Sequence, residues 1–291
     1  MPAYDLCVIL PLITDPENRI VSAYFEKIGY TGACAPTLDT LRRIHLLHPL
    51  TLPFENLDPL LARPVSIETE AVAAKLLGPV RRGGYCFEHN GLLASVLERS
   101  GFRITRLAAR VLWGMSDQAL SPRSHMLLLV HLDEGDFVVD VGFGGGTLTA
   151  PLRLDMTGEQ QTPHGLYRIE PHGTDYLLQA WREASWRPVY RFDLMPCLPV
   201  DYIATNYYLS NSPASVFCKT LFLAKVTPQG RYGLLGTQLS RRDTEGELIE
   251  RKTLGSADEA CQVLSDVFDV EVPDMASFAV VWQRVLNTVR N

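Results

Sequence analysis

The sequence predicts an α+β fold in which helices come first, antiparallel strands follow, and both kinds of element share the last third. Apolar residues recur at helix-face spacing over residues 19–100, and short runs of branched and aromatic residues take over after Gly101. Because helices and strands are segregated along the chain, this order favours α+β over alternating βαβ units. A chain of 291 residues is long enough for two or three domains.

Four helices are expected in residues 1–100. The first contains RIVSAYFEKIGY and stops at Gly29, and the second begins after Thr37, its predicted N-cap. A third is expected to open at Ser66, in SIETEAVAAKLL. The fourth follows Cys86 and carries an apolar stripe of leucines and a valine. Together these segments predict a helical bundle.

Strands are expected in residues 101–205. DEGD, at 133–136, predicts the hairpin turn between the second and third of them. The spacing of the runs predicts an antiparallel sheet or a small barrel. The candidate strands are TRLAARVLW, HMLLLVHL, DFVVDVGF, TDYLLQAW and RPVYRFDL.

Residues 206–291 mix strands and helices. TLFLAKV and RYGLLGTQLSRR predict a hairpin around residues 228–230, and LIERKTL adds a strand. Two helices close the chain. SADEACQVLSDVF opens with a capping box of Ser256 and Glu259, and DMASFAVVWQRVL has an apolar face with Phe278, Val281, Trp282 and Val285.

Composition and charge exclude several classes of protein. The net charge is −6 and neither sign forms a long block, which argues against nucleic acid as a partner. The longest apolar run near the start, Cys7 to Ile13, is interrupted by Pro11 and is far shorter than the ~20 residues of a membrane span, so neither a signal peptide nor an anchor is predicted. Six cysteines without CxxC spacing indicate free thiols in a reducing cytoplasm. The seven histidines show no ligand spacing, so no metal is predicted.

Cys86 stands in RRGGYCFEHN, directly before a predicted helix. The start of a helix and a nearby imidazolium both favour the thiolate form of a cysteine. Gly83 and Gly84 allow a sharp turn and a close approach of another molecule to the sulfur. For an isolated cysteine the commoner role is a small buried hydrophobic residue, and the other five cysteines are assigned that role. A nucleophilic role needs a base.

His125 and Asp140 are the candidates for that base and for the group that orients it. His125 begins one strand of the predicted hairpin and Asp140 ends the other, so antiparallel pairing places them beside each other. A carboxylate on one ring nitrogen fixes the tautomer and presents the other nitrogen to the thiol. The alternatives are a strand-end histidine bonded to the backbone and a solvated aspartate.

GFGGG, at 142–146, resembles a phosphate-binding loop but lacks the Lys-Ser/Thr of a P-loop. We expect it to form a tight turn whose open backbone lies at the mouth of the site, where amides can meet phosphates. Adjacent arginines, Arg81 with Arg82 among them, are assigned to the solvated surface.

With these residues identified, the chain resembles the arylamine N-acetyltransferases. The family's motif Arg-Gly-Gly-x-Cys-x-Glu-x-Asn is complete at residues 82–90, and YFEKIGYTG, LPFENLD, ARVLWG, DVGFGG and NYYLSNSPASVF follow the family's order. The resemblance implies a helical bundle in 1–100, a β-barrel in 101–205 and an α/β lid in 206–291, with a papain-like Cys-His-Asp arrangement. Residues 1–18 precede the similar region, and the absence of a long insertion after the barrel favours the bacterial type.

The resemblance also implies a chemistry. Acetyl-coenzyme A acetylates Cys86, with His125 as acid and base and Asp140 as orienter. The acetyl group then passes to the nitrogen of an arylamine, arylhydrazine or N-hydroxyarylamine by a ping-pong mechanism, a role in xenobiotic metabolism. By position, the acceptor pocket comprises Phe54, Val111, Phe143 and Phe217, and coenzyme A enters near Gly142, Gly144 and Gly145.

Three other functions are compatible with the same sequence. An amide synthase, or a cysteine amidase or transglutaminase-like acyl transferase, would keep the triad and change the acceptor. A binding module with an inert cysteine would need no triad.

Overall fold

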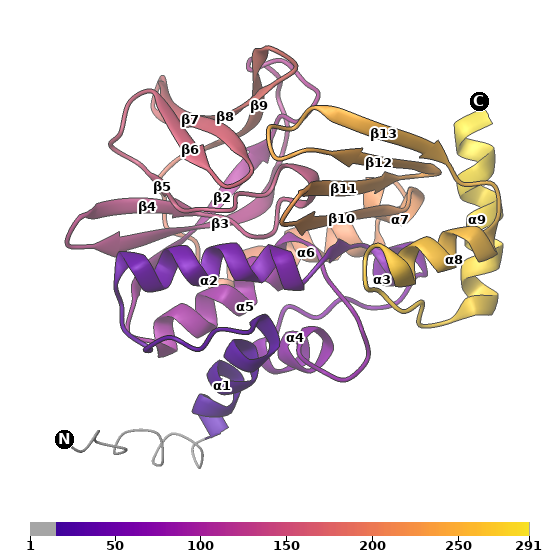
Figure 1. Ribbon diagram of the computed structural model, residues 1–291, viewed down its shortest axis with the longest axis horizontal. Coiled ribbons are helices and arrows are strands. Elements are labelled where there is room, and N and C mark those ends of the chain that lie inside the picture. Colours follow the sequence, from indigo (N-terminus) through magenta and orange to yellow (C-terminus); the bar gives the residue numbers. More distant parts are fainter. Residues whose placement is uncertain (1–15, 291) are drawn as a thin grey trace.

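The computed structural model describes residues 16–290, in which helices from the first hundred residues pack below two antiparallel sheets (Figure 1). Thr37 caps the second helix as predicted, because its hydroxyl accepts the N–H of Thr40. The third helix begins later than predicted: Ser66 accepts the N–H of Glu68 in a local turn, and the helix starts at Thr69. The helices are α1 (Pro16–Ile28), α2 (Leu38–Thr51), α3 (Leu57–Leu60), α4 (Thr69–Leu76) and α5 (Cys86–Arg99).

One segment of the predicted bundle is a strand. Residues Phe54–Glu55 form β1, which pairs with Ala224 and Leu223 of the C-terminal sheet. Pro53, directly before β1, is compatible with a short edge strand and ends the helical pattern there. An early segment of the chain is thereby built into its last third.

Eight antiparallel strands form a nearly closed barrel, in the order β5-β4-β3-β2-β9-β8-β7-β6 (Figure 1). Leu132 pairs with Gly135, so the predicted hairpin turn lies at the two residues between them. Five of the strands were expected; β5, β6 and β7 were not, because β5 and β6 are short and polar and β7 carries Pro171. The bounds are β2 (Arg103–Val111), β3 (Arg123–Leu132), β4 (Gly135–Val139), β5 (Leu152–Arg153), β6 (Glu159–Thr162), β7 (Gly165–His172), β8 (Asp175–Arg182) and β9 (Ser185–Phe192).

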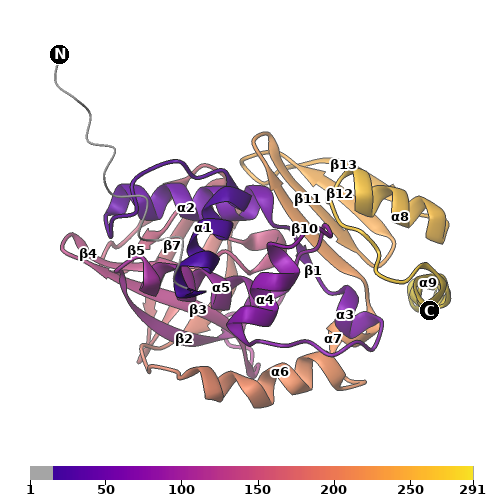
Figure 2. The ribbon, with the colours of Figure 1, turned by 90° about the horizontal axis from the view of Figure 1, so that it is seen from below.

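The last third holds a five-stranded sheet, β1-β10-β11-β12-β13, and four helices (Figure 2). Residues 231–242 form two strands and not one, with a turn at Gly236, where φ is +58°. Helix α6 was not expected, because half of the residues that it buries are polar. The elements are α6 (Tyr202–Asn211), α7 (Val216–Lys219), β10 (Phe222–Thr227), β11 (Gly230–Leu235), β12 (Gln238–Arg242), β13 (Leu248–Thr253), α8 (Ala257–Asp266) and α9 (Met275–Arg290), with 3₁₀ turns at Gly144–Gly146 and Pro199–Asp201.

The closing helices agree with the sequence in most details. Ser256 accepts the N–H of Glu259, but the Glu259 carboxylate caps Gly255 and not Ser256. Of the expected buried face of α9, Val281 is only partly buried. The α+β class is confirmed, and the division at residues 100 and 205 stays a prediction.

Three apolar clusters hold these parts together. The first joins the helices to one face of the barrel sheet and contains Cys86; the second fills the barrel; the third lies between the C-terminal sheet and α8 and α9, around Trp282. No helix among the described residues is long and apolar enough to cross a membrane. The prediction about residues 1–18 falls mostly outside the described residues.

Candidate active site

Cys86 is the first residue of α5, and its side chain is buried at 4% exposure. The loop before it is too tightly packed for a side chain at two positions. A Cβ on Gly83 would lie 1.9 Å from the carbonyl oxygen of Pro53, and one on Gly84 would lie 2.7 Å from the Glu88 carboxylate. The two glycines are therefore required by packing against the protein itself.

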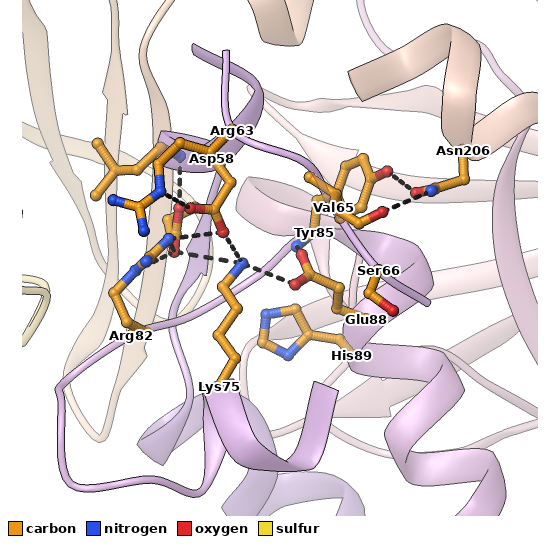
Figure 3. Close-up of polar contacts among 12 residues, drawn as sticks. Asp58, Arg63, Val65, Ser66, Lys75, Arg82, Tyr85, Glu88, His89 and Asn206 are labelled. Carbon is orange, nitrogen blue, oxygen red and sulfur yellow. Dashed lines mark hydrogen bonds and ion pairs between the residues drawn. The ribbon is translucent and has the colours of Figure 1, made fainter. Parts of the chain in front are cut away.

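A group of five charged side chains, four of them buried and Lys75 partly buried, holds this loop (Figure 3). Lys75 Nζ lies 2.7 Å from the carboxylates of both Asp58 and Glu88, and Arg82 Nη2 lies 2.7 Å from Glu55. Burial lowers the pKa of Lys75, but the surrounding carboxylates outweigh burial and raise it. The assignment of Arg82 to the surface was wrong: its side chain is buried, and these ion pairs offset the cost of removing its charge from water.

His125 and Asp140 lie side by side in the β3–β4 hairpin. The distance from His125 Nε2 to Asp140 Oδ2 is 2.7 Å, and both side chains are buried. Leu128 pairs with Val139, a register that places Asp140 opposite Leu127 and therefore diagonal to His125. The hairpin brings the two together, as the sequence predicted, through a diagonal contact.

Asn90 joins the two strands from the side of α5. Its Nδ2 donates to Asp140 Oδ1 at 2.8 Å and to the Met126 carbonyl at 2.7 Å, and its Oδ1 accepts the N–H of Val141 at 3.0 Å. Burial raises the pKa of Asp140, but the His125 charge and these hydrogen bonds outweigh burial and lower it. The helix that carries Cys86 thus also fixes the ionised carboxylate.

Cys86 lies beside this pair: its Sγ is 3.9 Å from the carbonyl oxygen of Ser124, the residue before His125, and its thiol interacts electrostatically with the imidazole. Because His125 Nε2 is bonded to Asp140, Nδ1 is the nitrogen available to the thiol. Burial lowers the pKa of His125, but the Asp140 charge, the hydrogen bond with Asp140 and the interaction with Cys86 outweigh burial and raise it to about 10. A base of this strength beside a thiol can accept its proton and keep it during nucleophilic attack.

A chain of buried polar groups, not indicated by sequence spacing, supports α5 one turn after Cys86. The Pro53 carbonyl can only accept, so His89 Nε2 donates to it at 3.1 Å. His89 Nδ1 then accepts from His48 Nε2 at 2.8 Å, and His48 Nδ1 accepts from the Tyr24 hydroxyl at 2.7 Å. Every hydrogen bond therefore points the same way, and α1, α2 and α5 are tied to the residue before β1.

His45 is a further neutral histidine, because its Nε2 accepts the backbone N–H of Asp140 at 3.2 Å. Burial lowers the pKa of His45 and of His89 to about 4, against a partly offsetting Asp140 charge. Burial, with the neighbouring His89 and His45, lowers the pKa of His48 well below its ordinary value.

We expect the free energy of unfolding to fall as the pH drops from about 6.5 towards 4. In this window the unfolded state protonates these three histidines and the folded state does not, so each one removes up to about 1.4 kcal/mol per pH unit. His125 acts on the alkaline side: its raised pKa adds stability that is present below about pH 6.5 and is lost as the pH rises through about 10. Urea unfolding at a series of pH values measures both limbs.

His89→Gln is the variant that isolates one histidine. Glutamine can still donate to the Pro53 carbonyl and accept from His48. We therefore expect the free energy of unfolding to depend less steeply on pH below about 6.5, by the contribution of one proton. His172→Gln, at a partly exposed position of β7, is the matched control. If the free energy of unfolding of the wild-type protein did not change between about pH 6.5 and 4, the assignment of these histidines as neutral in the folded state would be contradicted.

Two groups of aromatic rings lie on either side of the candidate site, one on His89 and one on His125. Phe54 stacks on His89, with ring centroids 6.4 Å apart, and contacts Phe217 at 6.1 Å and Phe222 at 5.3 Å. Two of the four expected pocket residues therefore lie together, and Phe222 joins them.

The second group surrounds His125. Phe143 contacts His125 at 5.1 Å, Tyr190 at 5.4 Å and Trp113 at 5.8 Å between ring centroids. Val111 ends β2 directly opposite Tyr190. The other two expected pocket residues thus belong to the barrel side of the site. Trp113, in the turn after β2, and Tyr190, in β9, were missed because neither carries a local sign of its partners.

The three glycines expected to admit coenzyme A have different surroundings. Gly142 donates its N–H to Asp140 Oδ1 at 3.0 Å, and a Cβ there would lie 3.0 Å from the Cys86 Cα, so its amide is not open. Gly144, at φ +75°, packs on Phe222. Of the three, Gly145 is the one that faces open space, and it lines a cleft beside Trp113. No group of three or more His, Cys, Asp or Glu suited to a metal occurs within residues 16–290.

The family model and the relatives that match this chain are all N-acetyltransferases. A family model described as N-acetyltransferase matches residues 37–277. An arylamine N-acetyltransferase of Escherichia coli K12 is 40% identical, over 88% of this chain and 90% of its own length. An arylamine N-acetyltransferase / N-hydroxyarylamine O-acetyltransferase of Salmonella typhimurium is 38% identical, over 89% and 91%. The solved structure of Mycobacterium marinum arylamine N-acetyltransferase in complex with CoA superposes with a TM-score of 0.86 at 37% identity, over 91% and 99% of the two chains.

Proposed function

The chain belongs to the arylamine N-acetyltransferase family, and from this premise we propose that it moves acetyl groups from acetyl-coenzyme A to aromatic amines through an acetyl-Cys86 intermediate. The observation that carries the mechanism is the buried hydrogen-bonded pair of His125 and Asp140, with the buried thiol of Cys86 at the backbone of the residue before His125. The CoA complex of the Mycobacterium marinum relative supports coenzyme A as the carrier.

In the first half-reaction His125 Nδ1 accepts the Cys86 proton and the thiolate attacks the thioester carbonyl. The tetrahedral intermediate collapses, the thioester C–S bond breaks, and the leaving thiolate of coenzyme A takes the proton from His125. Asp140 stabilises the imidazolium between these two transfers. The enzyme is left acetylated on sulfur.

In the second half-reaction an acceptor nitrogen attacks the acetyl-cysteine carbonyl. His125 takes the proton from that nitrogen, the C–S bond breaks, and Cys86 leaves as the thiolate. The acceptor lies against Phe54 and Phe217 on one side and Phe143 on the other, where flat rings find stacking partners. The name of the Salmonella relative supports N-hydroxyarylamines as further acceptors, and we propose arylhydrazines as well. We place this activity in the cytoplasm, as the free thiols of the sequence suggest. We propose xenobiotic amines as its substrates, as the family resemblance implies.

Intact-protein mass spectrometry tests the proposal. Mixing the protein with acetyl-coenzyme A and no acceptor should add one acetyl group, which proteolysis then maps to the peptide of Cys86. Adding an arylamine should remove that group and yield the acetylated amine. Release of free acetate at the same rate without amine would favour a hydrolase, and a folded protein that never acquires the acetyl group would refute the mechanism.

A further inference from the structure

Phe54, whose ring forms one wall of the proposed acceptor site, belongs to a strand of two residues. Its backbone pairs with Ala224 of β10 on one side. On the other side Glu55 donates its N–H to the carbonyl of Gly84 at 2.8 Å, in the loop before Cys86. A strand this short has few ladder hydrogen bonds, so the position of the Phe54 ring also depends on contacts outside the strand.

His89 makes the contact directly outside this strand. Its Nε2 donates to the Pro53 carbonyl at 3.1 Å, and its ring stacks on Phe54 with 6.4 Å between centroids and 13° between planes. One side chain therefore contacts both the backbone before Phe54 and the face of its ring. Because His89 follows Cys86 by three positions in α5, the two lie on the same face of the helix.

The orientation of the His89 ring is fixed by α1 and α2. His48 Nε2 donates to His89 Nδ1 at 2.8 Å, and the Tyr24 hydroxyl donates to His48 Nδ1 at 2.7 Å. All three side chains are fully buried, so bulk water does not compete for these bonds. The hydroxyl satisfies the bare Nδ1 of His48 and so stabilises the tautomer that directs the His89 proton at Pro53.

The catalytic pair is held by a different residue of the same helix. Asn90 donates to Asp140 Oδ1 at 2.8 Å, whereas His89 is bonded to His48 and Pro53. Loss of the His89 hydrogen bonds should therefore affect the aromatic wall more than the acetylation of Cys86.

We propose that His89 is a positioning residue for acceptor selection: it holds the Phe54 wall at a set distance from the thiol of Cys86 and thereby limits the size of the aromatic amine. This inference rests on the proposed function. A well-fitted apolar pocket discriminates by about 10- to 200-fold between ligands that differ by one methylene group. A wall that is less firmly held should discriminate less against larger rings.

The experiment measures the two half-reactions separately. Acetylation of Cys86 by acetyl-coenzyme A, without acceptor, is followed by rapid-quench intact mass spectrometry. The acetylated protein is then mixed with aniline or with 2-naphthylamine, which present the same amino group on one ring and on two fused rings. The ratio of the second-order rate constant for 2-naphthylamine to that for aniline, called here the ring-size ratio, reports on the room beside the thiol.

His89→Leu removes the hydrogen bonds to Pro53 and His48 and keeps a buried apolar side chain. We expect the ring-size ratio to rise by about three- to tenfold, while the rate of Cys86 acetylation stays within about twofold of the wild-type rate. His89→Gln can still donate to Pro53 and accept from His48, so it should restore the wild-type ratio.

Tyr24→Phe perturbs the same hydrogen bonds from their far end and keeps the ring that fills the core. It leaves His48 Nδ1 without a donor, so we expect the ring-size ratio to rise by about twofold. Tyr30→Phe is the matched control. It also removes a buried hydroxyl, which donates to the Ala33 carbonyl at 2.9 Å directly after α1, and it should leave the ratio unchanged.

Several results would overturn the proposal. A folded His89→Leu protein with the wild-type ring-size ratio would show that His89 does not limit the acceptor, and a ratio equally altered in His89→Gln would exclude the hydrogen bonds as the cause. Acetylation of Cys86 that slows as much as the acceptor step would assign His89 a purely structural role. If His89→Leu does not fold, a wild-type ratio in Tyr24→Phe overturns the proposal. A wild-type protein that is never acetylated would instead refute the proposed function.

Discussion

We expect Cys86→Ala to abolish both acetylation of the protein by acetyl-coenzyme A and turnover with an arylamine. Without the thiol there is no acyl intermediate, and the remaining binding groups can only hold donor and acceptor near each other. The change removes one sulfur atom from a buried position, so the fold should persist with a small loss of stability. The acetyl increment in the intact mass and the rate of amine acetylation measure the effect.

Cys261→Ala is the matched control, since Cys261 is likewise a free cysteine at a helix of the fold, although it is only partly buried, in α8. It should acquire the acetyl group as the wild-type protein does. Persistent turnover in Cys86→Ala, with a normal circular dichroism spectrum, would show that another group accepts the acetyl.

Asp140→Asn should slow acetylation of Cys86 by about 10³- to 10⁴-fold. Asparagine Oδ1 can still accept from Asn90, which leaves its amide group facing His125 Nε2. Two donors cannot pair, so the imidazole changes tautomer and carries its proton on Nδ1, where it can no longer accept the proton of the thiol. Single-turnover acetylation followed by mass spectrometry measures the rate.

The same hairpin supplies a control pair. Asp136 lies 2.6 Å from His131 Nδ1 at the other end of β4, and its side chain is half-exposed. Asp136→Asn should leave the acetylation rate at the wild-type level. A wild-type rate in Asp140→Asn as well would mean that the carboxylate does not orient His125.

The part of the site that sequence reasoning located is the part held by local geometry. Cys86 follows two glycines and opens a helix, and His125 and Asp140 are joined by a short hairpin. Both patterns are readable because few residues separate cause and effect. The order of helices, barrel and mixed tail was predictable for the same reason, since each follows from periodicity within one segment.

The rest depends on contacts between segments that are far apart in the chain. His48 meets His89 across 41 positions, and Tyr85 shares a hydrogen bond with Asn206 across 121. The spacing of residues within one helix or strand does not predict such pairs. Polar content also hid α6, whose buried face includes Asn206 and Ser210. The sequence predicted a tight turn at Gly142. Its close approach to the backbone of Cys86 was not predictable, because it depends on how α5 packs against the barrel.

The pairing of β1 with β10 has a consequence for biosynthesis. A ribosome delivers Cys86, His125 and Asp140 well before Ala224 and Leu223, the residues that pair with Phe54 and Glu55. Domains tend to fold as they emerge, from the N-terminal end onward. Here the surroundings of Phe54 can be completed only when the last third of the polypeptide has been translated, so a prematurely terminated chain would contain Cys86 without the strand that holds Phe54 in place.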